Sequence, residues 1–208
     1  DVAFPSQLYN ISYTYFQKVS FLESPAVVLS KLFAQYPKHQ NIISLVYNMR
    51  IIGGQLKSRQ FHPPQNIPTR PTTDFAKEGL FNMLNNNFDF EAVKFLDLFG
   101  GTGSISYEMS SRGCTDIAIV EQFPKCANFI KKTAKEFGFT GMRVFPMDVF
   151  KYMQHCTEQY DLIFAGPPYP LPNLPEIPDL IFQYKLLKDD GWFIMEYNPI
   201  NNFEQHLN

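Results

Sequence analysis

With 208 residues, the chain is long enough for one ordinary domain plus an appendage. Its formal net charge of −2 excludes both a strongly basic, non-specific nucleic-acid-binding protein and an acidic tail protein. No apolar run approaches the ~20 residues of a membrane span, and the start lacks a basic, hydrophobic secretion signal. Three widely spaced cysteines without a C-x-x-C motif disfavour disulfides and a cysteine-ligated zinc, so we expect a reducing cytoplasmic location.

Residues 1–48 differ from the rest of the chain, because they combine many aromatics with only two acids and three bases. Aromatic and polar side chains alternate over Leu8–Phe16, which predicts a half-exposed strand. Ser24-Pro25 and the apolar run that follows to Tyr36 predict a capped helix with proline at its first position. No motif here carries chemistry, so we treat residues 1–48 as an N-terminal extension of unknown role.

A β-hairpin is expected over Met49–Pro64, with a turn at Gly53-Gly54 and a return strand near Arg59–His62. Thr72-Thr73-Asp74 can then cap a helix that runs to about Asn85.

The segment from Met49 to Lys77 has a local charge of +4, since it contains five bases and one acid, Asp74. This balance suits contact with phosphate, although charge alone supports a solvated hairpin face equally well. The five bases are Arg50, Lys57, Arg59, Arg70 and Lys77.

From Val93 onward, strands and helices alternate, which predicts a mainly parallel α/β sheet. The expected strands are the one around Asp97, followed by Asp116–Glu121, Met142–Pro146, Asp161–Ala165 and Gly191–Tyr197. The expected helices are Ser104–Arg112, Pro124–Phe137, Val149–His155 and Asp179–Lys185.

The first of these strands contains Asp97 and ends in a glycine turn, Gly100–Gly103, which leads into a helix. Such a turn lets a ligand approach the backbone and faces it with the amide-rich end of the helix. The dinucleotide fingerprint would need a third glycine where Ser106 stands, which disfavours nicotinamide and flavin cofactors. An acid just before the turn instead suits a cationic ligand such as S-adenosylmethionine, although a purely structural turn also needs glycines.

Three further features follow strands and should share the carboxyl edge of the sheet with the glycine turn. Glu121, about twenty residues beyond the turn, is placed to accept both ribose hydroxyls of a nucleoside. Asp148 could accept from an adenine amino group, and the loop Gly166–Tyr169 follows the next strand. Each acid alone is more often a solvated strand end or a helix cap, so the indication comes from their convergence.

From Met49 to about His206 the chain resembles the bacterial methyltransferases that modify a guanine N2 in 16S ribosomal RNA. The resemblance is carried by the segments Met49–Gly54, Arg70–Thr73, Lys77-Glu78, Leu80–Asn82, Asp97–Gly103, Asp161–Phe164 and Pro167–Tyr169. It implies a Rossmann-like, S-adenosylmethionine-dependent domain that acts on 16S ribosomal RNA or the small ribosomal subunit. The reaction needs no metal and the sequence offers no metal site, and a monomer is the simplest expectation.

The resemblance also implies roles for individual residues. The implied cofactor-binding residues are Arg70, Thr72, Asp97, Phe99, Gly101, Gly103, Glu121, Gln122, Asp148 and Val149. The implied catalytic and target-base residues are Gly166, Pro167, Pro168 and Tyr169. Together with the local positive charge, it points to Arg50, Lys57, Arg59 and Arg70 as the RNA contacts.

Three departures from the family pattern stand out. Residues 1–48 lie outside it, and the sequence ends at Asn208, before the final strand pair that the family's sheet has, so we expect the domain at 49–208 to lack that pair. The family motif is Asp-Pro-Pro-Tyr or Asn-Pro-Pro-Tyr, whereas residue 166 is glycine. Losing one preorganised polar group typically costs about 10² to 10³ in rate, so the sequence predicts donor binding with poor methyl transfer.

Two other functions remain open. One is a catalytically silent RNA-binding homologue, which Gly166 and the extra N-terminal segment favour. The other is an amino-methyltransferase for another nucleic-acid base or a protein amide, because a Pro-Pro-Tyr loop serves several planar amides and amines. The sequence offers no separate target-recognition domain, which argues against a DNA-modifying enzyme. A nicotinamide oxidoreductase is a less favoured function than either alternative.

Overall fold

The computed structural model describes residues 13–18, 49–65, 67, 72–168 and 171–197. Its main sheet has six strands in the order β1-β8-β7-β4-β5-β6, and all but β1 run parallel. The parallel strands are β4 (Lys94–Asp97), β5 (Asp116–Val120), β6 (Met142–Phe145), β7 (Tyr160–Ala165) and β8 (Leu187–Tyr197). The expected parallel α/β fold is therefore confirmed.

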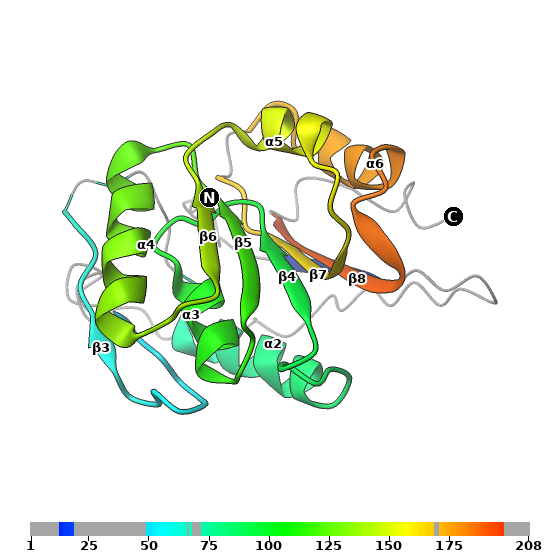
Figure 1. Ribbon diagram of the computed structural model, residues 1–208. Helices are drawn as coiled ribbons and strands as arrows, with labels where there is room; N and C mark the ends of the chain where they lie inside the picture. The colour runs from blue at the N-terminus through cyan, green and yellow to red at the C-terminus, as the bar shows by residue number, and fades with distance from the viewer. Residues whose placement is uncertain (1–12, 19–48, 66, 68–71, 169–170, 198–208) are drawn as a thin grey trace, which may run out of the picture.

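Helices cover both faces of this sheet (Figure 1). One face packs against α5 (Val149–His155) and α6 (Glu176–Gln183), and the other packs against α2 (Asp74–Asn85), α3 (Ser104–Ser111) and α4 (Pro124–Phe137). Successive strand residues alternate between the two cores: Leu96 joins the first and Phe95 the second. This period of two explains why the strands read as continuous apolar runs, because both of their faces are buried.

The N-terminal edge of the family-like region is the expected antiparallel hairpin, although its strands are short. Strand β2 (Met49–Arg50) pairs with β3 (Gln60–Phe61), and the residues between them form the turn. Strand β1 (Tyr13–Lys18) pairs antiparallel with β8 at the edge of the main sheet. It overlaps the strand predicted at Leu8–Phe16 but both begins and ends later in the chain. The helix predicted up to Tyr36 lies outside the described residues.

Helix α2 begins as predicted, because the Thr73 hydroxyl oxygen accepts a hydrogen bond from the Ala76 backbone N–H at 3.2 Å. One of the five bases counted in this region is not available to a phosphate. Lys77, counted among the bases suited to phosphate contact, is only 1% exposed and lies 3.2 Å from the buried Glu108 carboxylate of α3. Its ammonium group also donates to the Arg50 carbonyl oxygen, so Lys77 joins the hairpin, α2 and α3 instead of facing solvent.

Besides β1, two elements begin three or more residues away from their expected starts, while the other boundaries differ by at most two residues. Strand β8 begins at Leu187 instead of Gly191, since Leu187 pairs with Tyr160 and the register shifts before Leu162 pairs with Trp192. Helix α6 begins at Glu176 rather than at Asp179, because a proline in the first turn, here Pro178, lacks only an N–H that the helix does not use.

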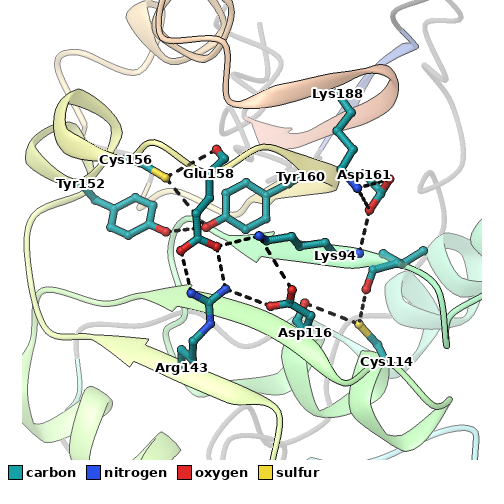
Figure 2. Close-up of polar contacts among 11 residues, drawn as sticks. Lys94, Cys114, Asp116, Arg143, Tyr152, Cys156, Glu158, Tyr160, Asp161 and Lys188 are labelled. Atoms are coloured by element: carbon teal, nitrogen blue, oxygen red, sulfur yellow. Dashed lines mark hydrogen bonds and ion pairs between the residues drawn. The ribbon is translucent and has the colours of Figure 1, made fainter.

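The amino-terminal edge of the sheet carries a charged cluster formed by Lys94, Asp116, Arg143 and Glu158 (Figure 2). The two carboxylate oxygens of Glu158 accept from Arg143 at 2.8 and 2.9 Å, and Lys94 Nζ lies 2.8 Å from the same group. Arg143 also donates to Asp116 at 2.9 Å. These contacts fasten the start of β4 and β5 to β6 and to the residue ahead of β7.

Within the described part of the chain, no helix combines the length and the apolar character needed to cross a membrane.

Candidate active site

A pocket of about 410 Å³ opens at the carboxyl edge of the parallel strands, opposite the charged cluster. Most of the residues predicted to bind the cofactor or the target base contribute to its lining. These residues are Thr72, Asp97, Phe99, Gly101, Glu121, Gln122, Asp148, Val149, Gly166, Pro167 and Pro168. Segments far apart in sequence thus converge on one cavity, as the strand order requires.

Among the described residues predicted to bind the cofactor or the target base, Gly103 alone does not line the pocket. Arg70 and Tyr169 lie outside the described residues. Gly103 caps the start of α3 with a φ of +81°, and a Cβ there would lie 2.5 Å from the Tyr107 ring. Gly103 therefore holds the shape of the turn from behind, because only glycine fits that conformation and that contact.

Glu121 fixes the glycine turn from the neighbouring strand. Its side chain is 5% exposed, and its two carboxylate oxygens accept from the backbone N–H groups of Gly101 and Phe123, each at 2.7 Å. Burial raises the pKa of Glu121, and the two amide hydrogen bonds oppose this shift. A carboxylate has about four lone-pair sites, so these contacts leave capacity for hydroxyl groups of a ligand.

Asp97, the last residue of β4, lies at the base of the pocket and is 2% exposed. Its Oδ2 accepts from the Ser106 hydroxyl at 2.7 Å, whereas its buried Oδ1 has no hydrogen-bond partner among the described residues. Burial raises the pKa of Asp97 to about 7, the Ser106 and Phe99 hydrogen bonds oppose the shift, and the charge of Glu121 adds to it. An acceptor in this state favours a cationic hydrogen-bond donor.

Ser104 is a pocket residue that the sequence analysis missed. Its buried hydroxyl, at the first position of α3, also has no hydrogen-bond partner among the described residues. The lining also includes Gly100 and Thr102 of the predicted glycine turn, and the other unpredicted lining residues are Ile67, Ile105, Phe123, Phe150, Phe164, Leu171 and Glu196. Adjacency to predicted residues could have identified several of these, such as Phe123 after Gln122 and Phe150 after Val149.

Asp148 both caps a helix and lines the pocket. Its Oδ1 accepts from the Lys151 backbone N–H at 3.0 Å and so caps α5, while the residue also lines the pocket. Val149 and Phe150 continue the lining with apolar surface. This combination of one acid and apolar neighbours suits a flat heterocycle with an amino group.

Gly166 directly follows β7, and its φ lies outside the left-handed region, so its backbone would accept a side chain. A Cβ at this position would lie 3.2 Å from Cε1 of the Phe164 ring and 4.0 Å from Oε2 of Glu196. The Phe164 ring thus lies close to the space that a side chain at residue 166 would need.

The predicted phosphate contacts are distributed over the hairpin. Lys57 and Arg59 are exposed, and the Arg59 guanidinium lies over the Phe137 ring at 5.5 Å. Arg50 is half-exposed and its Nε lies 2.7 Å from the Asp74 carboxylate, which raises the pKa of Arg50. Such an exposed ion pair is worth at most about 1 kcal/mol, so it leaves Arg50 available to a polyanion.

Two curated relatives cover much of this chain. One is a putative rRNA methyltransferase, YlbH, of Bacillus subtilis, which is 32% identical over 154 residues and matches across 72% of this chain and 83% of its own length. The other is the ribosomal RNA small subunit methyltransferase D of Escherichia coli K12, which is 28% identical over 148 residues, or 71% of either chain.

The fold is likewise similar to that of a solved structure, a putative methyltransferase, yhhF, from Escherichia coli. The two share 26% sequence identity and superimpose with a TM-score of 0.66 over 72% of this chain and 81% of the other. Residues 49–208 match the model of the family described as "Conserved hypothetical protein 95". The chain therefore belongs to that family, which its relatives mark as one of Rossmann-like methyltransferases.

Proposed function

We propose that this protein is an S-adenosylmethionine-dependent methyltransferase that modifies the exocyclic N2 of a guanine in 16S ribosomal RNA. The curated relatives are rRNA methyltransferases by name, which supports the substrate class. The observation that carries the proposal is the pocket at the carboxyl edge, which contains the Asp97 Oδ1 atom that has no hydrogen-bond partner among the described residues.

The polar groups of the pocket fit the proposed donor. Asp97 Oδ1 would accept from the ammonium group of the methionine part, and the Ser104 hydroxyl would donate to its carboxylate. Glu121 would accept from the ribose hydroxyls, and Asp148 would accept from the adenine amino group. The buried Asp97 and Ser104 oxygens, which have no hydrogen-bond partner among the described residues, would each thereby gain one, as a polar site built for a ligand requires.

The amino nitrogen of guanine is a weak nucleophile, because its lone pair is delocalised into the ring. The Pro167 carbonyl would accept one amino hydrogen and so direct the lone pair out of the ring plane, and Tyr169 would stack on the flipped base. When bound, S-adenosylmethionine supplies an electrophilic methyl group on a sulfonium. The remaining task of the chain is positioning, which provides much of the rate in an in-line displacement.

Four bases between residues 50 and 70 supply the proposed RNA contacts. Arg50, Lys57, Arg59 and Arg70 would contact phosphates, which position the substrate without reading its sequence. We further propose that the protein acts as a monomer in the cytoplasm, on ribosomal RNA or on the small ribosomal subunit.

Calorimetry with S-adenosylmethionine, followed by transfer of a tritiated methyl group to small-subunit RNA that lacks the modification, tests the function. We expect a single donor site and incorporation that maps to a guanine N2. Donor binding without incorporation would favour a second candidate, a catalytically silent RNA-binding homologue, which the glycine at residue 166 supports. Incorporation into another base or a protein amide would instead identify a different amino-methyltransferase.

A further inference from the structure

The carboxyl ends of β7 and β8 bring Gly166 next to a carboxylate that no motif marks. The two strands are parallel, with Phe164 paired to Ile194 and Ala165 paired to Met195. The next residues along this register are Gly166 and Glu196, and both line the pocket.

One carboxylate oxygen of Glu196 lies near the space that a side chain at residue 166 would enter. Oε2 of Glu196 lies 4.0 Å from the Cβ position of residue 166. Residues at adjacent positions on paired strands face the same side of a sheet, so side chains at residues 166 and 196 would lie next to each other. The carboxylate of Glu196 and the missing carboxylate of residue 166 thus serve one region of the pocket.

We propose that Glu196 is a catalytic residue that supplies, from β8, the hydrogen-bond acceptor that Gly166 lacks. The proposal rests on the proposed function, since it assigns an acceptor for the target amino group. Glu196 would accept one amino hydrogen while the Pro167 carbonyl accepts the other. It also revises the expectation drawn from Gly166 alone: the chain transfers methyl groups despite its glycine.

The same carboxylate can complete the proton balance of the reaction. The amino nitrogen forms a bond to the methyl carbon as the carbon–sulfur bond breaks, and the electron pair of that bond stays on sulfur. The nitrogen, now carrying a positive charge, releases one proton to the Glu196 carboxylate, which passes it to water. A carboxylate accepts both the hydrogen bond and the proton, whereas a glutamine would accept only the hydrogen bond.

The surroundings of Gly166 agree with an acceptor that comes from β8 instead of from residue 166. The Phe164 ring lies 3.2 Å from the Cβ position of residue 166, so a side chain there requires the ring to shift by a few tenths of an ångström, whereas glycine requires no shift. With glycine at residue 166, the carboxylate of Glu196 serves this part of the pocket without a second carboxylate beside it.

The test compares rates of methyl transfer to under-methylated small-subunit RNA. We expect Glu196→Ala to lower the rate constant by about 10² to 10³, the usual effect of removing one preorganised polar group at a reacting centre. Adding Gly166→Asp to Glu196→Ala should restore at least about a tenth of the parent rate, whereas adding Gly166→Ala should restore none, because it brings the same Cβ without an acceptor. Asp190→Ala removes an exposed acid from the same strand and serves as the matched control, with a rate equal to that of the parent.

Calorimetry with S-adenosylhomocysteine shows whether each variant is folded, and Glu196→Ala should keep its dissociation constant within about twofold of the parent's, since the glutamate serves the target base. Equal rates for the parent and Glu196→Ala would overturn the proposal. An inactive parent that becomes active with Gly166→Asp would also overturn it, while leaving the proposed function intact. If neither the parent nor any residue-166 variant transfers methyl groups, the proposed function itself fails, and the role of Glu196 fails with it.

Discussion

Replacing Asp97 by asparagine should change both the pH dependence of stability and the affinity for the donor. Asp97 is buried, and one of its carboxylate oxygens has no hydrogen-bond partner among the described residues. Asparagine keeps the shape and the contact with Ser106 but carries no charge. We therefore expect Asp97→Asn to be more stable than the parent at neutral pH and to bind S-adenosylmethionine less tightly.

The magnitude follows from the pKa of Asp97, which burial raises from 3.8 to about 7. Each tenfold change in proton affinity is worth about 1.4 kcal/mol, so ionising Asp97 within the fold costs on the order of 4 kcal/mol. Because the folded pKa exceeds the unfolded one, the folded state holds the extra proton between about pH 4 and pH 7. Stability is therefore lost as the pH rises through that window, and the loss is complete above about pH 7.

Urea unfolding of both proteins at pH 5, 6, 7 and 8, followed by circular dichroism, measures this effect. The free energy of unfolding of Asp97→Asn minus that of the parent should increase by roughly 2–3 kcal/mol between pH 5 and pH 8. Glu121 titrates in both proteins, so its contribution largely cancels in the difference. Calorimetry should show donor affinity reduced by about 10- to 100-fold, the worth of a hydrogen bond to a charged group. A stability difference that stays constant with pH would refute the reasoning.

Two further predictions concern the ion pairs that hold the fold. Lys77→Met should destabilise the protein by about 3 kcal/mol, because it leaves the fully buried Glu108 with less compensation, and adding Glu108→Gln should recover part of that loss in urea unfolding. Glu158→Gln should cost only about 1 kcal/mol at pH 7, since water screens this partly exposed group. The hydrogen bonds from Arg143 lower the pKa of Glu158 from 4.5 to about 2, so its contribution is present above pH 4.5 and fades as the pH falls toward 2; a cost that persists unchanged at pH 2–3 would contradict this account.

The fold was largely predictable because its local signals agree with its tertiary packing. Helix α4 has the predicted bounds, since Pro124 starts it and Gly138, with a φ of +74°, ends it. The start of β8 was not predictable, because its first residue, Leu187, pairs with Tyr160 and a register shift separates this pair from the Leu162–Trp192 pair. That pairing depends on where β7 lies, which local sequence does not encode.

The candidate site divides in the same way. Acids that directly follow strands, such as Glu121 and Asp148, could be predicted because parallel strands bring their carboxyl ends to one edge. The burial of Lys77 could not, since its partner Glu108 comes from another helix. Glu196 also escaped prediction, because its relevance depends on the register between β7 and β8 and on the glycine across from it.

The central claim is that this pocket transfers a methyl group to ribosomal RNA. The most direct measurement incubates the purified protein with tritiated S-adenosylmethionine and small-subunit RNA lacking the modification, and then identifies the labelled nucleoside. We expect label in a guanosine methylated at N2, abolished when the donor is omitted. Donor binding without any label in the RNA, under conditions in which a known small-subunit methyltransferase labels it, would contradict the account.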